Sequence, residues 1–328
     1  MAFAAPSFGC TFEPYISAFK SAVMRFDSLG YKAIIGDNVY ADCGIGISNT
    51  PMLCGRELQA MYSDDNSSIL IAAGGGELMC EILDYVDFDK IAAAEPKWYM
   101  GFSDNTNFTF LLTTLCDVAS IYGPHAGAFG MEPWHRAIND AYDLITGRKL
   151  KFGGYDYFEL ESLKDAEHPL AAYNATEPSV ITVHPKENVS FDGIMLGGCL
   201  DVLANLVGTK YDKVRAFNEK YKDKGVIWFL EACDLNVMSI RRAMWQLYEA
   251  GWFENAKGFI FGRPMHYDEP EMGLDRKNAV LDIVDKCKVP AILDADIGHL
   301  PPCIPVICGS MGHVEAANGR YTVEYRLF

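Results

Sequence analysis

The stretch Trp98-Tyr-Met-Gly-Phe-Ser-Asp-Asn-Thr-Asn-Phe-Thr-Phe-Leu-Leu112 joins an apolar run to a helix-length segment through a tight turn at Ser103. It predicts a buried strand, a turn and a helix. Such a turn lifts a serine hydroxyl clear of the sheet, and the amide of Asp104 can face an oxyanion at the helix N-terminus. Ser103 is therefore a candidate nucleophile. A serine or aspartate there is also compatible with ordinary helix capping, and Asn105 replaces the second glycine of a Gly-x-Ser-x-Gly elbow.

The same alternation of apolar runs and helix-length segments extends through the first 130 residues, which is typical of a parallel sheet with crossover helices. We expect helices in most of the gaps between the strands. The Gly-, Ser- and Asn-rich stretch Cys43–Met52 predicts a surface loop before a helix at Gly55–Tyr62. The predicted strands are Met1–Ala5, Lys32–Ile35, Ile69–Ala73, Trp98–Gly101 and Ser120–Tyr122.

A stretch of different composition and periodicity precedes the second half of the chain. Residues 152–189 show Gly-Gly-Tyr, scattered proline and mixed charge without helical periodicity, so we place a domain connection there. The 328 residues favour two domains. We expect an α/β fold with an N-terminal domain over 1–150, a connecting region over 151–189 and a C-terminal domain over 190–328. The elements predicted in the C-terminal domain are a strand-glycine-helix unit (Ile194–Gly208), strands at Gly225–Leu230 and Gly258–Phe261, helices at Met238–Glu249 and Lys277–Lys286, and short terminal strands.

Composition excludes several classes of function. A net charge of −16 disfavours nucleic acid and anionic membranes. The sequence shows neither a secretory signal nor an apolar stretch of about 20 residues. The ten cysteines contain no Cys-x-x-Cys pair, and the seven histidines are scattered, so we expect reduced thiols and no metal site. These features predict a cytoplasmic globular protein.

Three glycines follow the predicted strand Ile69–Ala73, at Gly74, Gly75 and Gly76. Glycines permit close backbone approach, so an amide there could complete an oxyanion hole. Neither Gly-x-Gly-x-x-Gly nor a following Gly-Lys-Ser/Thr is present, which argues against a nucleotide loop. An ordinary tight turn remains the plain alternative.

A carboxylate and an imidazole complete the candidate residues. Glu231 follows the apolar run Val226–Leu230 and should lie at the carboxyl edge of a buried strand, where ligands gather. It could orient a histidine or pair with a nearby arginine. His299 lies in a loop stiffened by Gly298 and three prolines, which suits a general base as well as a structural histidine. His125, after another strand, is the rival base.

Taken together, these motifs resemble the LD-carboxypeptidase and microcin-immunity family of serine peptidases nearly end to end. The resemblance is carried by Ala4-Ala-Pro-Ser7, the glycine turn with Glu81-Ile-Leu-Asp-Tyr-Val-Asp-Phe88, Gly101-Phe-Ser-Asp104, Tyr122-Gly-Pro124, Leu196-Gly-Gly-Cys-Leu200, Leu230-Glu231 with Ile240-Arg-Arg242, Gly258-Phe-Ile-Phe-Gly262, and Gly298-His299.

The resemblance implies an N-terminal, mostly parallel α/β sandwich domain and a smaller, β-rich C-terminal α/β domain, with the active site in the cleft between them. It implies a catalytic triad of Ser103, His299 and Glu231, with no metal or organic cofactor. The amides of Gly76 and Asp104 would form the oxyanion hole. Weaker substrate-binding candidates are Gly75, Arg242 and His125. Dimers are common in the family, so we expect a homodimer.

The leading function is hydrolysis of the amide before a C-terminal D-residue in cytoplasmic cell-wall peptides, with a small peptide as partner. The alternative is hydrolysis of peptidyl or aminoacyl nucleotide mimics, as in microcin immunity. The 152–189 stretch lacks the Trp that would stack on a base there and offers only Tyr155, Tyr157 and Phe158. A third alternative is a binding protein without turnover. Arg241 or Arg242 could favour a free terminal carboxylate.

Overall fold

The computed structural model describes residues 1–327 and divides the chain into two compact units. Unit 1 comprises Met1–Arg148 and Glu161–Asn174. Unit 2 comprises Lys149–Leu160 and Ala175–Phe328. The stretch 151–189, which the sequence marks as a connection, therefore contributes residues to both units. Its regular structure is limited to short strands, as the absence of helical periodicity predicts.

Unit 1 contains five parallel strands in the order β5-β4-β3-β1-β2. All five strands predicted from the sequence are confirmed. Their bounds are β1 (Ala2–Ala4), β2 (Ile34–Ile35), β3 (Ile69–Ala72), β4 (Trp98–Gly101) and β5 (Ser120–Tyr122). The helices are α1 (Tyr15–Ser28), α2 (Pro51–Ser63), α3 (Phe88–Ala93), α4 (Thr106–Cys116) and α5 (Arg136–Ile145), with 3₁₀ turns η1 (Asp37–Tyr40), η2 (Met79–Tyr85), η3 (Ser103–Asn105) and η4 (Ala126–Gly130).

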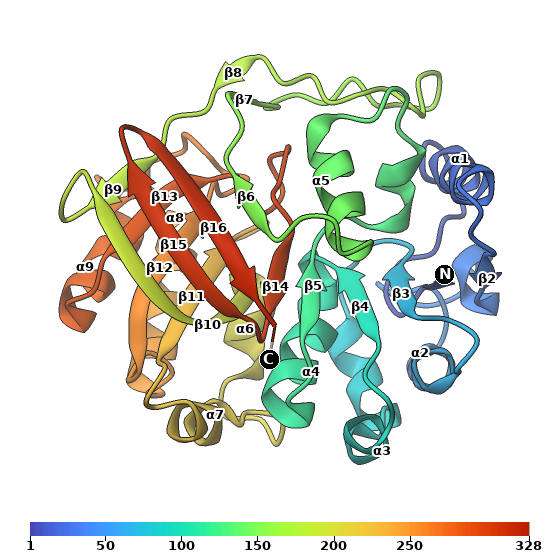
Figure 1. Cartoon of the computed structure of the whole chain (residues 1–328), viewed down its shortest axis with the longest axis horizontal. Helices are drawn as coiled ribbons and strands as arrows, with labels where there is room; N and C mark the ends of the chain where they lie inside the picture. The colour runs from blue at the N-terminus through green and yellow to red at the C-terminus, as the bar shows by residue number, and fades with distance from the viewer. Residues whose placement is uncertain (328) are drawn as a thin grey trace. The chain divides into compact units, whose positions relative to one another are not determined.

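Both faces of this sheet are covered by helices (Figure 1). Successive side chains of a strand point to opposite faces. In β1, Phe3 packs against Phe19 and Phe26 of α1, whereas Ala2 and Ala4 belong to the apolar cluster beneath α2 and α4. Burial on both faces explains why these strands are short continuous apolar runs in the sequence.

Unit 2 is built on an eight-stranded mixed sheet in the order β6-β16-β15-β10-β11-β12-β13-β9. Strands β10 to β13 run parallel, and the outer pairs are antiparallel. The bounds are β6 (Lys151–Gly153), β9 (Thr182–His184), β10 (Val189–Cys199), β11 (Val226–Glu231), β12 (Ala256–Gly262), β13 (Ala291–Ala295), β15 (Met311–Ala317) and β16 (Arg320–Arg326). The remaining elements are β7 (Tyr157–Phe158), β8 (Glu177–Pro178), β14 (Val306–Cys308), α6 (Leu200–Leu206), α7 (Val214–Lys220), α8 (Val237–Glu249) and α9 (Asn278–Cys287).

The parallel part of this sheet brings four carboxyl ends to one edge. Cys199 at the end of β10 pairs with Glu231 at the end of β11, and β12 and β13 end beside them. The prediction that Glu231 occupies a strand's carboxyl edge is confirmed. The mixed α/β fold class and the two-part organisation are confirmed as well.

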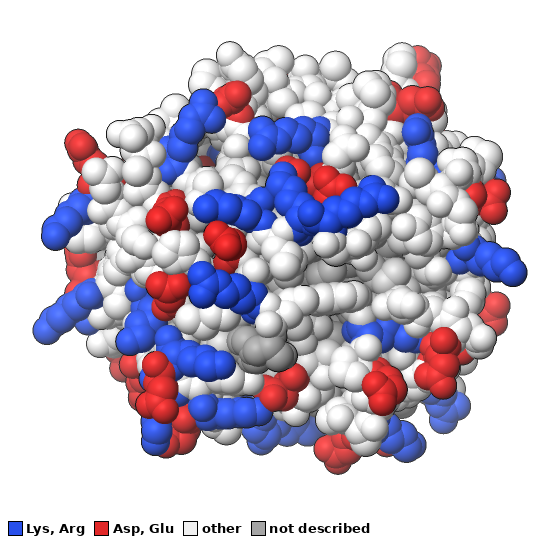
Figure 2. Space-filling model, in the orientation of Figure 1, with Lys and Arg blue, Asp and Glu red and all other residues white. Residues whose placement is uncertain are grey.

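The surface charges and the state of the cysteines are those of an ordinary globular protein. On the face shown in Figure 2, basic and acidic side chains are interspersed. All ten cysteines are free thiols. Among residues 1–327, no helix is both long and apolar enough to cross a bilayer. In the same described part of the chain, no group of His, Cys, Asp and Glu side chains is arranged to hold a metal ion.

Candidate active site

The serine turn of unit 1 has an unusual backbone. Strand β4 ends at Gly101, and Ser103 begins η3 with φ 62°, in the left-handed region that non-glycine residues seldom occupy. Such a conformation costs about 1–3 kcal/mol and persists where the surrounding structure imposes it. The N-cap residues of η3 and α4 are Phe102 and Asn105, so Ser103 is not a helix cap. The strand, turn and helix predicted from the sequence are all present.

Hydrogen bonds hold this turn in its strained shape. The backbone N–H of Ser103 donates to the hydroxyl of Tyr122 at 3.1 Å. The Asn105 amide donates to the carbonyl of Gly74 at 2.9 Å, and its oxygen accepts from the hydroxyl of Tyr99. Asn105, which stands where an elbow motif would have glycine, therefore ties the serine turn to the glycine turn.

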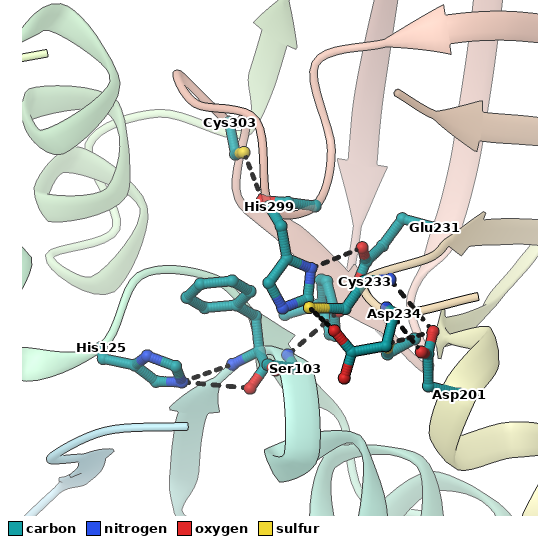
Figure 3. A network of polar contacts seen from close by, with 12 residues as sticks. Ser103, His125, Asp201, Glu231, Cys233, Asp234, His299 and Cys303 are labelled. Carbon is teal, nitrogen blue, oxygen red and sulfur yellow. Dashed lines mark hydrogen bonds and ion pairs between the residues drawn. The ribbon is translucent and has the colours of Figure 1, made fainter. Parts of the chain in front are cut away.

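His125 supports the same turn from the end of β5. Its ring stacks on Phe102 with centroids 4.3 Å apart. Its Nε2 lies 3.0 Å from the carbonyl oxygen of Phe102 and 3.2 Å from the side-chain nitrogen of Asn105 (Figure 3). The rival base of the sequence analysis is thus engaged in holding the residue before Ser103.

Asp104 ties the turn to the segment after the glycines. Its buried carboxylate accepts hydrogen bonds from the Ser7 hydroxyl, from the Met79 N–H at 2.9 Å and from the Asn107 amide at 3.0 Å. Burial raises the pKa of Asp104 to about 6, although the bonds from Ser7 and Met79 act in the opposite direction. The carboxylate of Asp104 is therefore used within unit 1 to hold the turn.

Of the three glycines, Gly75 faces the serine. A Cβ on Gly75 would lie 3.5 Å from Ser103 Oγ and 3.2 Å from His125 Cε1. A Cβ on Gly76 would instead lie 2.0 Å from Ser7 Oγ. The carbonyl of Gly75 accepts from the N–H of Phe8 at 2.7 Å, so the Gly76 N–H of the same trans peptide points away from Phe8.

In unit 2, the structure brings Glu231 and His299 together although 68 residues separate them. His299 Nδ1 lies 2.8 Å from Glu231 Oε2, and their side chains are 13% and 0% exposed (Figure 3). The carboxylate accepts the Nδ1 proton, which fixes the orientation of the imidazole ring. Burial by itself would lower the pKa of His299, but the charge and hydrogen bond of Glu231 hold that pKa well above its ordinary value.

Two glycines make room for this pair. Gly298 has φ 107°, and a Cβ there would lie 2.6 Å from Glu231 Oε2. At Gly262, which ends β12, a Cβ would lie 2.0 Å from the carbonyl oxygen of Ile297. Side chains at either position would displace the carboxylate or the histidine loop.

A buried ion pair anchors the loop that carries His299. The side chains of Arg263 and Asp296 are each 1% exposed and hydrogen-bonded to each other. Arg263 also donates to the Ser179 hydroxyl at 2.9 Å, and Asp296 accepts from the N–H of Tyr155 at 2.8 Å. The sequence reasoning missed this network. The signal was an arginine directly after an apolar strand, because a buried guanidinium must find a partner.

Asp201 and Cys233 are further residues that the sequence reasoning missed. Asp201, in the first turn of α6, accepts the N–H groups of Cys233 at 3.0 Å and Asp234 at 2.8 Å. These bonds fix the turn that follows β11. The Cys233 thiol donates to the carboxylate of Asp234 at 3.7 Å (Figure 3). The only signal in the sequence was the position of Cys233, two residues after Glu231.

The two arginines of α8 lie elsewhere. Arg241 donates to the carbonyl of Asn278 at 2.7 Å and pairs with Asp282 of α9. Arg242 is exposed and donates to the hydroxyl of Ser239 at 2.9 Å. Neither of these bonds involves Glu231, whose carboxylate is bonded to His299.

Unit 1 thus holds a strained serine, and unit 2 holds a histidine bonded to a buried carboxylate. Residues 1–123 match the model described as the LD-carboxypeptidase N-terminal domain, and residues 192–314 match the LD-carboxypeptidase C-terminal domain. The chain belongs to the LD-carboxypeptidase family.

Known proteins with similar sequence or structure extend over most of the chain. A protein of Treponema pallidum (strain Nichols) named "Putative carboxypeptidase" is 24% identical over 318 residues, which cover 94% of this chain and 87% of that protein. The crystal structure of muramoyltetrapeptide carboxypeptidase from Oxalobacter formigenes has a TM-score of 0.74 at 20% identity, with 100% of both chains covered. An MccF-like protein from Streptococcus pneumoniae, in complex with AMP, has a TM-score of 0.80 at 21% identity, covering 99% of this chain and 98% of that one. The two structures share the fold of this chain.

Proposed function

We propose that the protein is a serine carboxypeptidase that releases a C-terminal D-amino acid from murein peptides in the cytoplasm. Membership of the LD-carboxypeptidase family supports the reaction class, and similarity to a muramoyltetrapeptide carboxypeptidase supports the substrate class. The observation that carries the proposal is the φ of 62° at Ser103, because backbone strain at a serine on a strand-to-helix turn is typical of a nucleophile.

In the proposed mechanism, Ser103 Oγ attacks the carbonyl carbon while His299 Nε2 takes the hydroxyl proton. Glu231 holds the imidazole in the required tautomer and stabilises the imidazolium, as its 2.8 Å bond to Nδ1 supports. His299 then gives the proton to the leaving amine, and water resolves the acyl-enzyme. The reaction needs no metal or organic cofactor.

The backbone of unit 1 would stabilise the tetrahedral intermediate. In this proposal the amides of Asp104 and Gly76 bind the oxyanion. Gly75 has no side chain, which leaves space beside Ser103 Oγ for the scissile carbonyl. Loss of one such donor typically costs about 100- to 1000-fold in kcat.

The substrate would be a small peptide with a free terminal carboxylate. Because Arg241 is paired with Asp282, Arg242 is the better of the two candidates to bind that carboxylate. Among the aromatic residues considered for stacking on a nucleotide base, Tyr157 is 53% exposed, whereas Tyr155 and Phe158 are buried. We further propose that the protein acts as a homodimer.

The test is a comparison of kcat/KM on three compounds with purified protein. We expect release of D-alanine from a free murein tetrapeptide to be faster than from its C-terminal amide, and faster than cleavage of an aminoacyl sulfamoyl-adenylate. Fluorophosphonate labelling of native protein, with Ser103→Ala as the control, tests the nucleophile separately. A preference for the adenylate would move the protein to the microcin-immunity function. Absence of labelling would contradict the serine mechanism.

A further inference from the structure

The loop that carries His299 is closed by hydrogen bonds of its own backbone. It begins directly after β13, at Asp296, and the backbone carbonyl of Asp296 accepts the N–H of Ile304 at 2.8 Å. Within the loop, the Cys303 thiol donates to the carbonyl of Gly298 at 2.9 Å (Figure 3). Asp296 therefore stands at the base of the loop that holds the proposed general base.

The other polar atoms of Asp296 bind further segments of unit 2. Its N–H donates to the hydroxyl of Tyr321 at 2.9 Å. Its carboxylate accepts from the Ser179 hydroxyl at 2.9 Å, from the Tyr155 N–H at 2.8 Å and from the guanidinium of Arg263. Because the side chain is 1% exposed, water does not compete for these bonds. The base of the loop is thus held from several directions.

Arg263, which follows β12, binds the same place from the neighbouring strand. Its Nη1 donates to the carbonyl of Asp294 and to the Ser179 hydroxyl, both at 2.9 Å. Its guanidinium lies over the ring of Phe158, 4.4 Å from the ring centroid. Its Nε–H is buried and has no acceptor among residues 1–327. The arginine is therefore fixed in position, although one of its donors is left unsatisfied.

The stability of the fold alone does not account for this pair. Both side chains are 1% exposed, and the loss of hydration of two buried charges can exceed the energy of their attraction. The unsatisfied Nε–H of Arg263 is a further cost. Well-packed apolar residues of similar volume often stabilise a fold as well or better. Apolar residues would not supply directed bonds that fix one conformation of the loop base at Asp296.

We propose that Arg263 and Asp296 are positioning residues, which hold the base of the loop so that His299 meets Glu231. Glu231 ends β11, whereas His299 belongs to the loop after β13, so their 2.8 Å bond forms only if the loop keeps its place at the strand edge. The pair acts on His299 through the loop backbone. Its effect on turnover rests on the proposed function, whereas its effect on the bond between His299 and Glu231 does not.

The experiment compares the same substitution at two aspartates of one strand end. Asp296→Asn keeps the shape of the side chain and removes the charge that binds Arg263. The matched control is Asp294→Asn, because Asp294 is also buried and its carboxylate accepts from Arg276 at 2.8 Å. Asparagine also adopts the φ of 61° found at Asp294. The double variant Arg263→Met/Asp296→Asn removes both charges, so it leaves no unpaired buried guanidinium if Asp296→Asn fails to fold.

The first measurement is the proton NMR signal of His299 Nδ1, which the bond to the Glu231 carboxylate shifts downfield. His299→Gln assigns this signal by its absence. We expect the signal in native protein and in Asp294→Asn, and its loss in Asp296→Asn and in the double variant. The second measurement is kinetic. In the last two variants kcat should fall about 100-fold with little change in KM, because the base is misplaced while the substrate still binds. Asp294→Asn should keep the native kcat.

Retention of the Nδ1 signal in folded Asp296→Asn or in the double variant would overturn the positioning role. Its loss in Asp294→Asn as well would overturn that role too, since any buried charge at this strand end would then have the same effect. Absence of the signal from native protein would contradict the bond that the pair is proposed to maintain. If the signals behave as expected but fluorophosphonate does not label native protein, the proposed serine mechanism fails and the positioning of His299 stands.

Discussion

The serine turn of unit 1 and the histidine loop of unit 2 are held by different kinds of interaction. Neutral hydrogen bonds that involve the side chains of Tyr99, Asn105 and Tyr122 constrain the backbone at Ser103. The loop at His299 instead depends on buried charge, through Glu231 and the Arg263–Asp296 pair. The backbone conformation determines the direction of a nucleophile's side chain. The pKa of a general base depends instead on nearby charged groups.

The difference has an energetic counterpart. At Ser103 the structure stores backbone strain, so the fold would gain stability if a residue without that strain replaced it. At His299 the structure buries a carboxylate, and removal of one partner from such a pair leaves an uncompensated polar group. We therefore expect substitutions at Ser103 to lower activity with little loss of stability, and substitutions at the Glu231–His299 pair to affect both.

The largest effect is expected at the serine. Ser103→Ala should reduce turnover by about 10⁴-fold or more, because it removes the nucleophile, and should change the free energy of unfolding by at most about 1 kcal/mol. Ser103→Gly should be equally inactive but more stable than Ser103→Ala by about 1 kcal/mol, since glycine relieves the strain at φ 62°. Steady-state kinetics and urea unfolding check both variants. A large loss of stability with activity retained would show a structural serine.

The next effect concerns the charge on the carboxylate. Glu231→Gln should lower kcat by about 10³- to 10⁴-fold, because the amide no longer stabilises the imidazolium or enforces its tautomer. The fold should remain intact, as circular dichroism can verify.

The pH dependence sharpens this prediction. A general base must be unprotonated, so kcat/KM should fall as pH drops through the pKa of His299. Because Glu231 raises that pKa, the acid limb should lie above pH 6.5, the ordinary value for histidine. In Glu231→Gln the limb should move to lower pH. A limb unchanged by the substitution would contradict the assignment of the base.

A smaller effect is expected from the glycine beside the pair. In Gly298→Ala the added Cβ would lie 2.6 Å from Glu231 Oε2, so the carboxylate must move and turnover should fall by about 100-fold. The matched control is Gly208→Ala, which has a positive φ of 75° but nothing within 4 Å of the added atom. Gly208→Ala should lose about 1 kcal/mol of stability from the strain of positive φ alone, and Gly298→Ala should lose more because it adds the overlap with the buried carboxylate. Equal activities of the two variants in the kinetic assay would show that Gly298 is needed only for its backbone conformation and not for the position of Glu231.

The smallest effect concerns Asp104 and stability alone. Its pKa of about 6 in the folded protein is raised above the ordinary value of 3.8 by burial. Its contribution is therefore fully present below pH 3.8 and is lost as pH rises through about 6. Asp104→Asn should remove this dependence, so the variant should gain about 1–3 kcal/mol relative to the native protein between pH 4 and pH 7. Urea unfolding at both pH values measures the difference, and parallel curves would contradict a buried titrating carboxyl.

Much of the fold could be predicted because its signals are local. Each strand of unit 1 is a short apolar run bounded by turn residues, so its position follows from the sequence. The same holds for the serine turn and for Glu231 at a strand's carboxyl edge. The division of residues 151–189 between the two units was not predictable, because short strands such as β6 and β9 are defined by the partners they pair with.

The sequence by itself determined which residues stand at strand ends and turns, since hydrophobic periodicity and glycine placement act over a few residues. Only the tertiary structure decided the partner of Glu231. Arg241 and Arg242 were nearer in sequence, but α8 directs Arg241 to Asp282, and the parallel sheet brings His299 to the carboxylate. Sequence separation carries no information on contacts across a sheet edge. For that reason Cys233, Asp201 and the Arg263–Asp296 pair emerged only from the folded chain.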